Sequence, residues 1–264
     1  MHRVVMQGRT ALNIVISKLR ALAIHFAISA LVVGTLLAVI FLIWYPSPYF
    51  EVIGAWNVVR VLIGVAVVFG PLLTFVVYKS GKPSLVFDLS VIAVIQVAAF
   101  VYGATVIFQE RSYYTVFSED RFTVQAKKDV DMSDSDVAWD QQKPFVGPLL
   151  VVASLPEDQA ERERIITDVV VGSGVDVDQL PQYWSPYPDK VDAVLAVVKP
   201  LSHLQTTEKA TETVRRFIAR HGDDPNAFGF VPIIGRKRDF AMVIERATGM
   251  PVGVIDVNPW VFKE

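Results

Sequence analysis

The sequence contains no cysteine, and only four of its 264 residues are histidine. Without thiols the chain cannot form a disulfide, use a cysteine nucleophile or bind a metal through cysteine. The two histidines of the second half, His203 and His221, do not have the H-x-x-x-H spacing of a zinc site. Disulfide scaffolds and thiol enzymes are therefore excluded, and we expect no metal and no cofactor.

Charge is scarce in the first 111 residues, which hold eight Lys or Arg and three Asp or Glu. The remaining 153 residues hold seventeen Lys or Arg against twenty-four Asp or Glu, a net charge of −7. An acidic domain binds nucleic acid poorly, because phosphate recognition needs clustered cations. The hydrophobic fraction of the whole chain, 52%, is high for a soluble protein. We therefore expect an apolar N-terminal part, an acidic C-terminal part and no nucleic-acid partner.

Three long apolar runs lie in the charge-poor part, at about 21–45, 58–78 and 86–108. Each exceeds or matches the roughly 20 residues that cross about 30 Å of hydrocarbon as a helix. Three buried core helices are a poor alternative, because few polar residues remain to cover them. The first run is also too long for the apolar region of a cleaved signal peptide. We predict a cytoplasmic tail at 1–20 and a three-helix transmembrane domain at 21–111.

The short segments that flank these runs differ in their basic residues, which sets the expected orientation. The Lys and Arg residues before the first run and between the second and third are Arg3, Arg9, Lys18, Arg20, Lys79 and Lys82. The segment between the first and second runs has Glu51 and no Lys or Arg. Because basic loops stay in the cytoplasm, we expect a cytoplasmic N-terminus. The domain at 112–264 is then extracytoplasmic, and periplasmic in a Gram-negative bacterium.

Several helix-breaking or polar residues lie inside the predicted spans. Gly70-Pro71 near the middle of the second span predicts a kink, because proline lacks an N–H and crowds the preceding turn. A stripe at helical spacing on the third span comprises Asp88, Ile92, Gln96, Ala99 and Gly103. His25 and Asp88 each lie about one turn from the cytoplasmic edge, so a pair between them is considered.

The candidate contact residues of this part are His25, Ser29, Pro71, Thr74, Asp88, Gln96 and Gly103. Three roles are open for them: holding the three helices together, gripping a transmembrane helix of a partner, or relaying protons. A single carboxylate near one membrane edge is thin support for a proton pathway. The first two roles are favoured, because small and polar residues promote helix association in lipid.

The pattern of the remaining residues predicts an α+β domain with an antiparallel sheet. An S-x-x-E box at Ser154–Glu157 predicts the start of a helix that ends before Gly172. A second, amphipathic helix is expected at Thr207–Arg220. The predicted strands are Tyr113–Val116, Arg121–Ala126, Phe145–Ala153, Gly229–Ile234, Asp239–Ala247 and Val252–Val257.

No signature of catalysis stands out, since G-x-S-x-G, S-x-x-K and P-loop patterns are not evident. Four residues match positions of a calcium loop, namely Asp129, Asp131, Ser133 and Asp140. Asp134 stands where that loop needs glycine, so we interpret the stretch as a solvated acidic loop. The basic turn at Gly235–Arg238 is interpreted as an exposed hairpin tip. We therefore expect a protein that is not an enzyme.

Motifs in a fixed order along the chain resemble those of a known family. In the apolar part they are Ser17–Ala21 with His25 and Ser29, Trp44-Tyr45-Pro46-x-Pro48, Gly70–Thr74, Asp88-Leu89, Gln96 and Tyr102-Gly103. Later motifs are Lys199–Leu201 with Leu204, Thr248-Gly249 with Val252-Gly253, and Pro259-Trp260. Together they resemble the type IV pilin accessory proteins, the TfpX/TfpZ or FimB-like family, from about residue 17 onward. Residues 1–16 are an extension relative to that family.

The resemblance implies a multi-pass protein of the bacterial inner membrane that supports type IV pilin stability or pilus assembly without catalysis. It also implies a partner, the major pilin, whose long apolar N-terminal helix resides in the same membrane before assembly; membrane lipid is the other expected contact. The alternative is a membrane-anchored periplasmic ligand-binding or sensor protein. A sensor needs a cytoplasmic part that transmits its signal, and the cytoplasmic segments expected here are short. A membrane-bound hydrolase is a third possibility, for which the sequence supplies no catalytic group.

Overall fold

The computed structural model describes residues 2–172, 174–222, 224–236 and 238–260. Its contacts divide the chain into two compact units. The helical unit comprises the residues up to Phe41 together with Ala55–Phe108, and the sheet unit comprises Leu42–Gly54 together with the residues from Gln109 onward. The segment that connects the first two long helices therefore belongs to the sheet unit.

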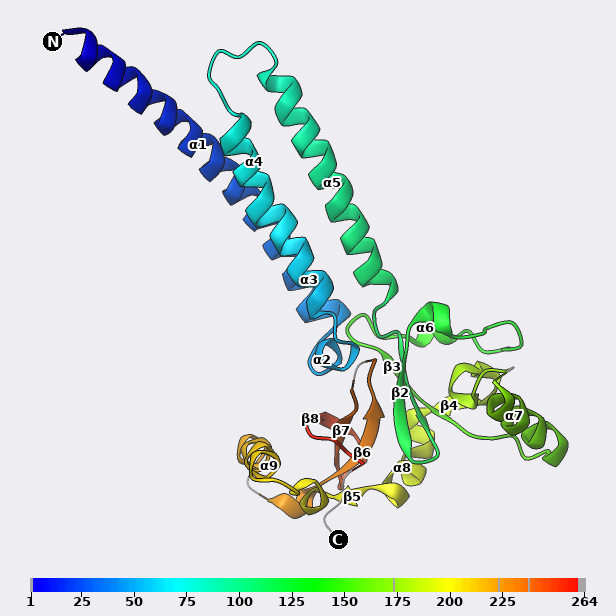
Figure 1. The fold of residues 1–264 in the computed structure, drawn as a ribbon. Helices are drawn as coiled ribbons and strands as arrows, with labels where there is room; N and C mark the ends of the chain where they lie inside the picture. The colour runs from blue at the N-terminus through cyan, green and yellow to red at the C-terminus, as the bar shows by residue number, and fades with distance from the viewer. Residues whose placement is uncertain (1, 173, 223, 237, 261–264) are drawn as a thin grey trace. The chain divides into compact units, whose positions relative to one another are not determined.

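Long apolar helices make up the helical unit (Figure 1). Its elements are α1 (His2–Val39), α3 (Trp56–Ile63), the π-helical turn η2 (Gly64–Phe69), α4 (Gly70–Val77) and α5 (Leu85–Gln109), and a further π-helical turn, η1 (Ile40–Trp44), follows α1. Three stretches are long and apolar enough to cross a membrane: Leu12–Trp44, Trp56–Val77 and Leu85–Gln109. They overlap the three runs predicted from the sequence, although the first stretch begins at Leu12 instead of about residue 21.

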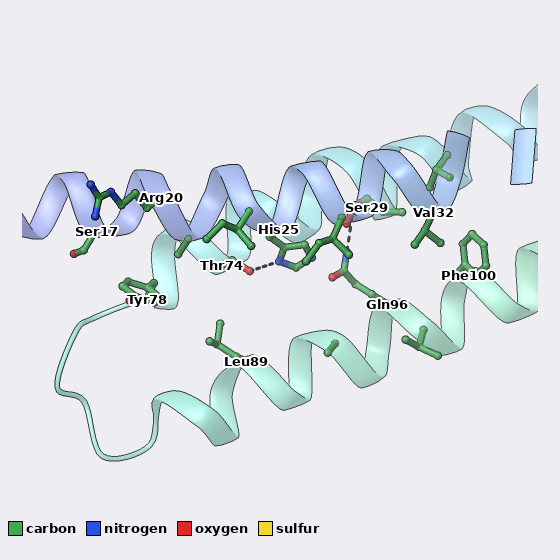
Figure 2. A pocket seen from close by; sticks show the side chains of 17 residues that line it. Ser17, Arg20, His25, Ser29, Val32, Thr74, Tyr78, Leu89, Gln96 and Phe100 are labelled. Carbon is green, nitrogen blue, oxygen red and sulfur yellow. Dashed lines mark hydrogen bonds between the residues drawn. The ribbon is translucent and has the colours of Figure 1, made fainter. Parts of the chain in front are cut away.

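The α5 helix packs less tightly than the other two long helices. Only 6% of its most apolar window is buried, against 17% for the first stretch and 28% for the second. Val86 and Val94 are 78% and 68% exposed. By contrast, α1 and α4 lie side by side (Figure 1). The space that this arrangement leaves between α5 and the other two helices is lined by the side chains drawn in Figure 2.

The widened turn η2 lies directly before Gly70-Pro71, where the sequence predicts a kink. The Gly70 N–H donates to the carbonyl of Val65, five residues back instead of four. A π-helical turn of this kind widens the helix locally. The wider turn relieves the crowding that the Pro71 ring would impose on the preceding turn of a regular helix.

Within the described residues, eight strands form one mixed sheet in the order β4-β3-β1-β2-β6-β7-β8, with β5 paired to β6. The strands are β1 (Tyr114–Ser118), β2 (Arg121–Gln125), β3 (Leu149–Ala153), β4 (Trp184–Pro186), β5 (Lys199–Pro200), β6 (Phe228–Ile234), β7 (Phe240–Glu245) and β8 (Pro251–Ile255). The β1·β3 and β2·β6 pairs are parallel, and the other pairs are antiparallel.

The prediction of an antiparallel sheet was therefore wrong in part. Strands joined by tight turns, such as β1 with β2 and β6 with β7, are antiparallel as expected. Parallel partners need a long crossover. Between β1 and β3 the chain returns along β2 and then through more than twenty further residues, and β2 and β6 are separated by more than a hundred residues. A pattern confined to neighbouring strands could not reveal either pair.

Short helices accompany the sheet. They are α2 (Tyr49–Ile53), α6 (Trp139–Gln142), α7 (Gln159–Val171), α8 (Val191–Val197) and α9 (Glu208–Arg220). The α9 helix begins one residue after the predicted start, and its N-cap is Thr207, whose hydroxyl accepts from the Ala210 N–H. The start predicted for α7 was wrong: its N-cap is Asp158, which accepts from the Glu161 N–H, so the S-x-x-E box at Ser154 is not used. Its end before Gly172 is confirmed.

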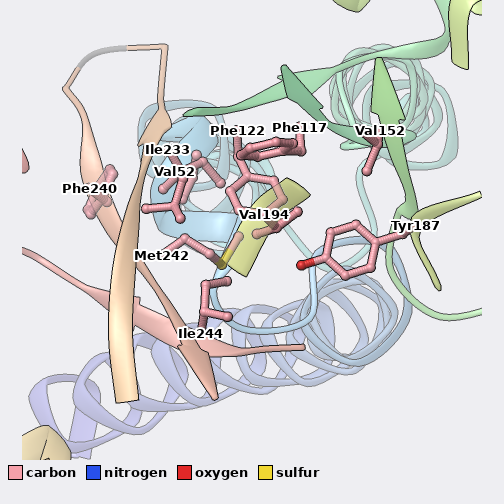
Figure 3. Close-up of a cluster of buried hydrophobic side chains, with 11 residues drawn as sticks. Val52, Phe117, Phe122, Val152, Tyr187, Val194, Ile233, Phe240, Met242 and Ile244 are labelled. Carbon is pink, nitrogen blue, oxygen red and sulfur yellow. The ribbon is translucent and has the colours of Figure 1, made fainter. Parts of the chain in front are cut away.

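The main core of the sheet unit includes a residue from the segment between the first two long helices. Val52 on α2 is 1% exposed and packs in a cluster with Phe122, Ile233 and Phe240 (Figure 3). Its backbone carbonyl also accepts a hydrogen bond of 3.2 Å from the Arg236 N–H. The 42–54 segment is thus built into the sheet unit by both packing and backbone hydrogen bonding.

Candidate functional site in the apolar helices

A groove of about 740 Å³ lies between α1, α4 and α5 in the helical unit (Figure 2). Most of its lining is aliphatic, with an aromatic side chain from Phe100. The polar lining residues are Ser17, Arg20, His25, Ser29, Thr74, Tyr78 and Gln96. Of the residues predicted from sequence, the groove brings together His25, Ser29, Thr74 and Gln96.

His25 and Thr74 join α1 to α4 at the wall of the groove. The His25 Nδ1 and the Thr74 Oγ1 lie 2.6 Å apart in a hydrogen bond, and Thr74 is 3% exposed. A buried hydroxyl without a partner is costly in an apolar environment. The bond satisfies that hydroxyl and fixes the imidazole against α4.

Gln96 joins α5 to the widened turn of the second apolar stretch. Its Nε2 donates to the carbonyl of Ala66 at 3.3 Å. That carbonyl has lost its usual helical donor, because the Gly70 N–H bonds to Val65 instead and the next residue, Pro71, has no N–H. The amide of Gln96 therefore donates the hydrogen bond to Ala66 that Pro71, without an N–H, cannot donate.

Gly70 gives Gln96 room to reach the turn. A Cβ atom on Gly70 would lie 1.8 Å from the Gln96 Nε2, well inside the closest approach of two such atoms. Any larger residue at position 70 would therefore displace the amide. The Gly70-Pro71 pair thus leaves the carbonyl of Ala66 without a donor in its own helix. It also leaves space for the Gln96 side chain that donates to this carbonyl.

The other predicted residues lie outside the groove lining. Pro71 is buried within its helix. A Cβ on Gly103 would lie 3.1 Å from Leu62 Cδ1, so Gly103 serves the approach of α5 to α3. Asp88 forms an ion pair with Lys82 and accepts a hydrogen bond from Ser84. The considered pair between His25 and Asp88 is not formed, because a nearer partner holds each side chain.

The face that α5 turns toward the groove is offset from the predicted stripe. The groove-lining residues of α5 are Leu89, Ala93, Gln96, Val97 and Phe100. Only Gln96 belongs to both sets. The stripe was chosen by polarity, whereas the lining follows an i, i+4, i+7, i+8, i+11 spacing that any face of this uniformly apolar helix satisfies. The groove therefore offers apolar contact area with a few fixed polar groups. Within the described part of the chain, no group of three or more His, Asp or Glu side chains is placed to hold a metal ion.

Comparison with known proteins places the chain in a family. The chain is 30% identical over 228 residues to the fimbrial assembly protein of serogroup I of Dichelobacter nodosus, a match that covers 84% of this chain and 88% of that protein. The chain belongs to the FimB family of fimbrial assembly proteins. The sequence resemblance to a FimB-like family is thereby confirmed.

Other relatives carry the same description. The fimbrial assembly protein of serogroup E1 from the same organism is 28% identical over 227 residues, again covering 84% of this chain and 88% of that protein. A shorter one, of serogroups C1 and C2, is 36% identical over 109 residues, which cover 40% of this chain. The FimB model itself matches residues 14–54, and no solved structure matches the chain.

The FimB match includes two features of the structure. It covers the groove-lining part of α1, with His25 and Ser29, and it continues through α2 into the segment that packs in the sheet unit. Val52 is not among the residues predicted from the sequence. Its signal was weak but present: a Tyr49-Phe50-x-Val52-Ile53 cluster of large apolar residues in a segment expected to be a loop.

Proposed function

We propose that this FimB-family protein is an inner-membrane accessory factor for type IV pilin stability or pilus assembly, and that it acts by binding pilin rather than by catalysis. Three apolar stretches cross the bacterial inner membrane, with the N-terminus in the cytoplasm and the sheet unit in the periplasm. The basic residues on the cytoplasmic side of those stretches support this orientation.

The observation that carries the proposal is the groove between α1, α4 and α5. Its lining is mainly aliphatic, and α5 has little of its own surface buried. Before assembly, type IV pilin lies in the same membrane through its long apolar N-terminal helix. In lipid, helices associate through close van der Waals packing and a few hydrogen bonds. The groove offers both to a docking helix.

Photocrosslinking tests the site directly. A photoreactive amino acid is placed in the full-length protein at Ala93 or at Phe100, which line the groove, in cells that make pilin. Matched positions at Val94 and Val101 on the same helix are 68% and 55% exposed and lie outside the lining. We expect pilin to be labelled from the groove positions and not from the matched pair.

Deletion of the gene tests the role itself. We expect lower pilin abundance and fewer surface pili, restored by the full-length protein. Unchanged pilin and pili in the null strain would contradict the proposed role. Equal labelling from both faces of α5, with reduced pili in the null strain, would contradict the groove as the contact while leaving the role in place.

A polar cavity in the sheet unit favours the second candidate function, a periplasmic ligand-binding or sensor protein. This cavity of about 390 Å³ lies beside α2 and is lined in part by Gln125, Lys128, Asp129 and Arg236. A periplasmic small molecule that raises the thermal stability of the purified protein, together with normal piliation in the null strain, would favour it over the pilin-binding role.

A further inference from the structure

Three basic side chains of the sheet unit converge on one buried tyrosine ring. The guanidinium of Arg111 lies 5.0 Å from the centroid of Tyr113, and the ammonium groups of Lys127 and Lys143 lie 5.5 and 5.2 Å from it. Tyr113 is 8% exposed. These three cations and the ring are called the basic cluster. Cations within about 6 Å of an aromatic ring are attracted to its face, so the ring holds like charges close together.

Lys127 and Lys143 differ in their hydrogen-bond acceptors. Asp140 forms an ion pair with Lys127. The ammonium of Lys143 donates instead to two neutral acceptors, the carbonyls of Pro144 at 2.8 Å and Gly147 at 2.9 Å. Burial, together with the nearby charge of Arg111, holds the pKa of Lys143 below its usual range. An anion placed beside Lys143 and Arg111 would relieve this repulsion.

The chain fixes the basic cluster close to where two apolar stretches end. Arg111 comes two residues after Gln109, the last residue of the third stretch, so their Cα atoms are at most about 7 Å apart. The Gly147 N–H donates to the carbonyl of Ile43 at 3.2 Å, and Ile43 lies in the last turn of the first stretch. If these stretches span the bilayer, the basic cluster lies at the level of the lipid headgroups.

An exposed aromatic side chain accompanies the basic cluster. Phe145 is 81% exposed and Val146 is 48% exposed, and both lie between Lys143 and Gly147. An apolar tip beside cations is typical of segments that lie in the membrane interface, where the apolar side chain enters the acyl boundary and the cations contact phosphates.

We propose that Arg111, Lys127 and Lys143 bind the phosphate of an anionic phospholipid in the adjacent leaflet while Phe145 inserts among its acyl chains. The 143–147 segment thereby anchors the sheet unit to the membrane surface. The inference rests on the membrane-spanning role of the apolar stretches, and it is independent of whether pilin is the partner. Its ligand is a lipid phosphate, distinguished in the test from free phosphate.

A depth measurement tests the insertion of Phe145. Because the chain has no cysteine, Phe145→Cys gives a single labelling site in the full-length protein. The label is an environment-sensitive fluorophore, and the protein is placed in nanodiscs of phosphatidylcholine and phosphatidylglycerol that carry an acyl-chain quencher. Val170→Cys on α7 is the matched control, because Val170 is 80% exposed. We expect quenching at position 145 and not at position 170. Equal quenching at both positions, or at neither, would overturn the insertion.

A second measurement tests the phosphate contact. Native mass spectrometry of the detergent-solubilised full chain follows the binding of added phosphatidylglycerol. Removing one cation, in Arg111→Gln or Lys143→Gln, is expected to weaken binding about fivefold. Lys209→Gln on the surface of α9 removes the same charge elsewhere and should leave binding unchanged. Unchanged lipid binding in both cluster variants, or full displacement of the lipid by inorganic phosphate, would overturn the proposal. If a cluster variant fails to fold, the depth measurement, in which all three cations are kept, still tests whether the 143–147 segment enters the membrane.

Discussion

Gln96 on α5 makes the hydrogen bond that Pro71 on α4 cannot make. The Gln96 Nε2 donates to the carbonyl of Ala66 at 3.3 Å, and Pro71 stands where a π-helical turn would place the N–H donor for that carbonyl. In lipid, a polar backbone group without a partner is costly, so a break in a helix is tolerated when a neighbouring helix satisfies it. The proline of one helix and the glutamine of another therefore form one structural unit.

Gln96→Leu is expected to destabilise the protein by about 1–3 kcal/mol, because it strips a buried carbonyl of its donor. In a Pro71→Ala background the same change should cost much less, since the restored N–H can satisfy the turn from within its own helix. The measurement is thermal or denaturant unfolding of the four proteins in detergent. Equal cost in both backgrounds would show that Gln96 does not act through the carbonyl of Ala66.

Gly70→Ala should displace the Gln96 amide, because the added Cβ would lie 1.8 Å from its Nε2. The amide is the far end of a flexible side chain, so we expect it to move away and to lose its bond, at a cost of about 1 kcal/mol. Gly64→Ala in the same stretch is the matched control, because a Cβ there meets nothing within 4 Å. Unfolding of each variant in detergent checks the difference. If the two variants lost the same stability, the close approach would have no consequence.

Thr74→Val removes the hydroxyl that binds His25 while keeping the shape of the side chain. Interhelical hydrogen bonds in membrane proteins contribute about 0.6 kcal/mol on average and up to about 2 kcal/mol. We expect a coupling energy in that range from a double-mutant cycle with His25→Leu. Thr35→Val is the matched control, because the Thr35 hydroxyl bonds to Leu31 of its own helix. Additive effects of the two changes would contradict the bond between α1 and α4.

Much of the helical unit could be predicted from the sequence. Span positions follow from length and apolarity, and His25, Ser29, Thr74 and Gln96, which line the groove, are among the candidate contacts predicted from the sequence. The bonding partners were not predictable. A pair of Asp88 with His25 was considered, but Asp88 instead contacts Lys82 and Ser84, which lie close to it along the chain and are reached at lower entropic cost. The π-helical turn leaves the carbonyl of Ala66 without a donor in its own helix, and this turn has no sequence signal beyond Gly70-Pro71.

In the sheet unit, too, local features could be predicted from the sequence and long-range contacts could not. Hairpins such as β1 with β2 and β6 with β7 follow from alternation and turn residues, which are local. The parallel contacts of β1 with β3 and of β2 with β6 depend on how distant segments share one core. Arg236 illustrates the limit: it is exposed, as predicted for its turn, but its ion pairs with Glu110 and Asp129 have no local signal in the sequence. Lys237 of that turn lies outside the described residues.

Val52→Ala tests whether the segment between the first two long helices is part of the core of the sheet unit. Val52 is 1% exposed, so the loss of two methyl groups should reduce the free energy of unfolding by about 2 kcal/mol. Val137→Ala makes the same chemical change at a side chain that is 43% exposed, and its effect should stay within about 0.5 kcal/mol. Tryptophan fluorescence during denaturant unfolding of the full chain compares them. Equal effects would mean that α2 does not stabilise the sheet unit.

Asp178 is a buried carboxyl group near the end of β2. It is 8% exposed, and the Gln125 Nε2 donates to its Oδ2 at 3.0 Å. Burial raises the pKa of Asp178, and the nearby charge of Asp176 acts in the same direction, while hydrogen bonds from Thr123 and Gln125 oppose the shift. The folded protein therefore holds this proton more tightly than the unfolded chain does. Between the unfolded and the folded pKa, stability falls as pH rises.

Asp178→Asn should remove that dependence. The amide oxygen still accepts from Gln125, and no charge is left to bury. We expect the variant to gain stability relative to the native protein as the pH rises from about 4, and the gain to level off above the folded pKa, where the native carboxyl is fully charged. Melting temperature against pH for the full chain in detergent measures this, with the exposed Asp136→Asn as the control that should give no such rise. A difference between variant and native protein that stays constant from acid to neutral pH would mean that the pKa of Asp178 is the same in the folded and unfolded states, and that the hydrogen bonds from Thr123 and Gln125 offset its burial.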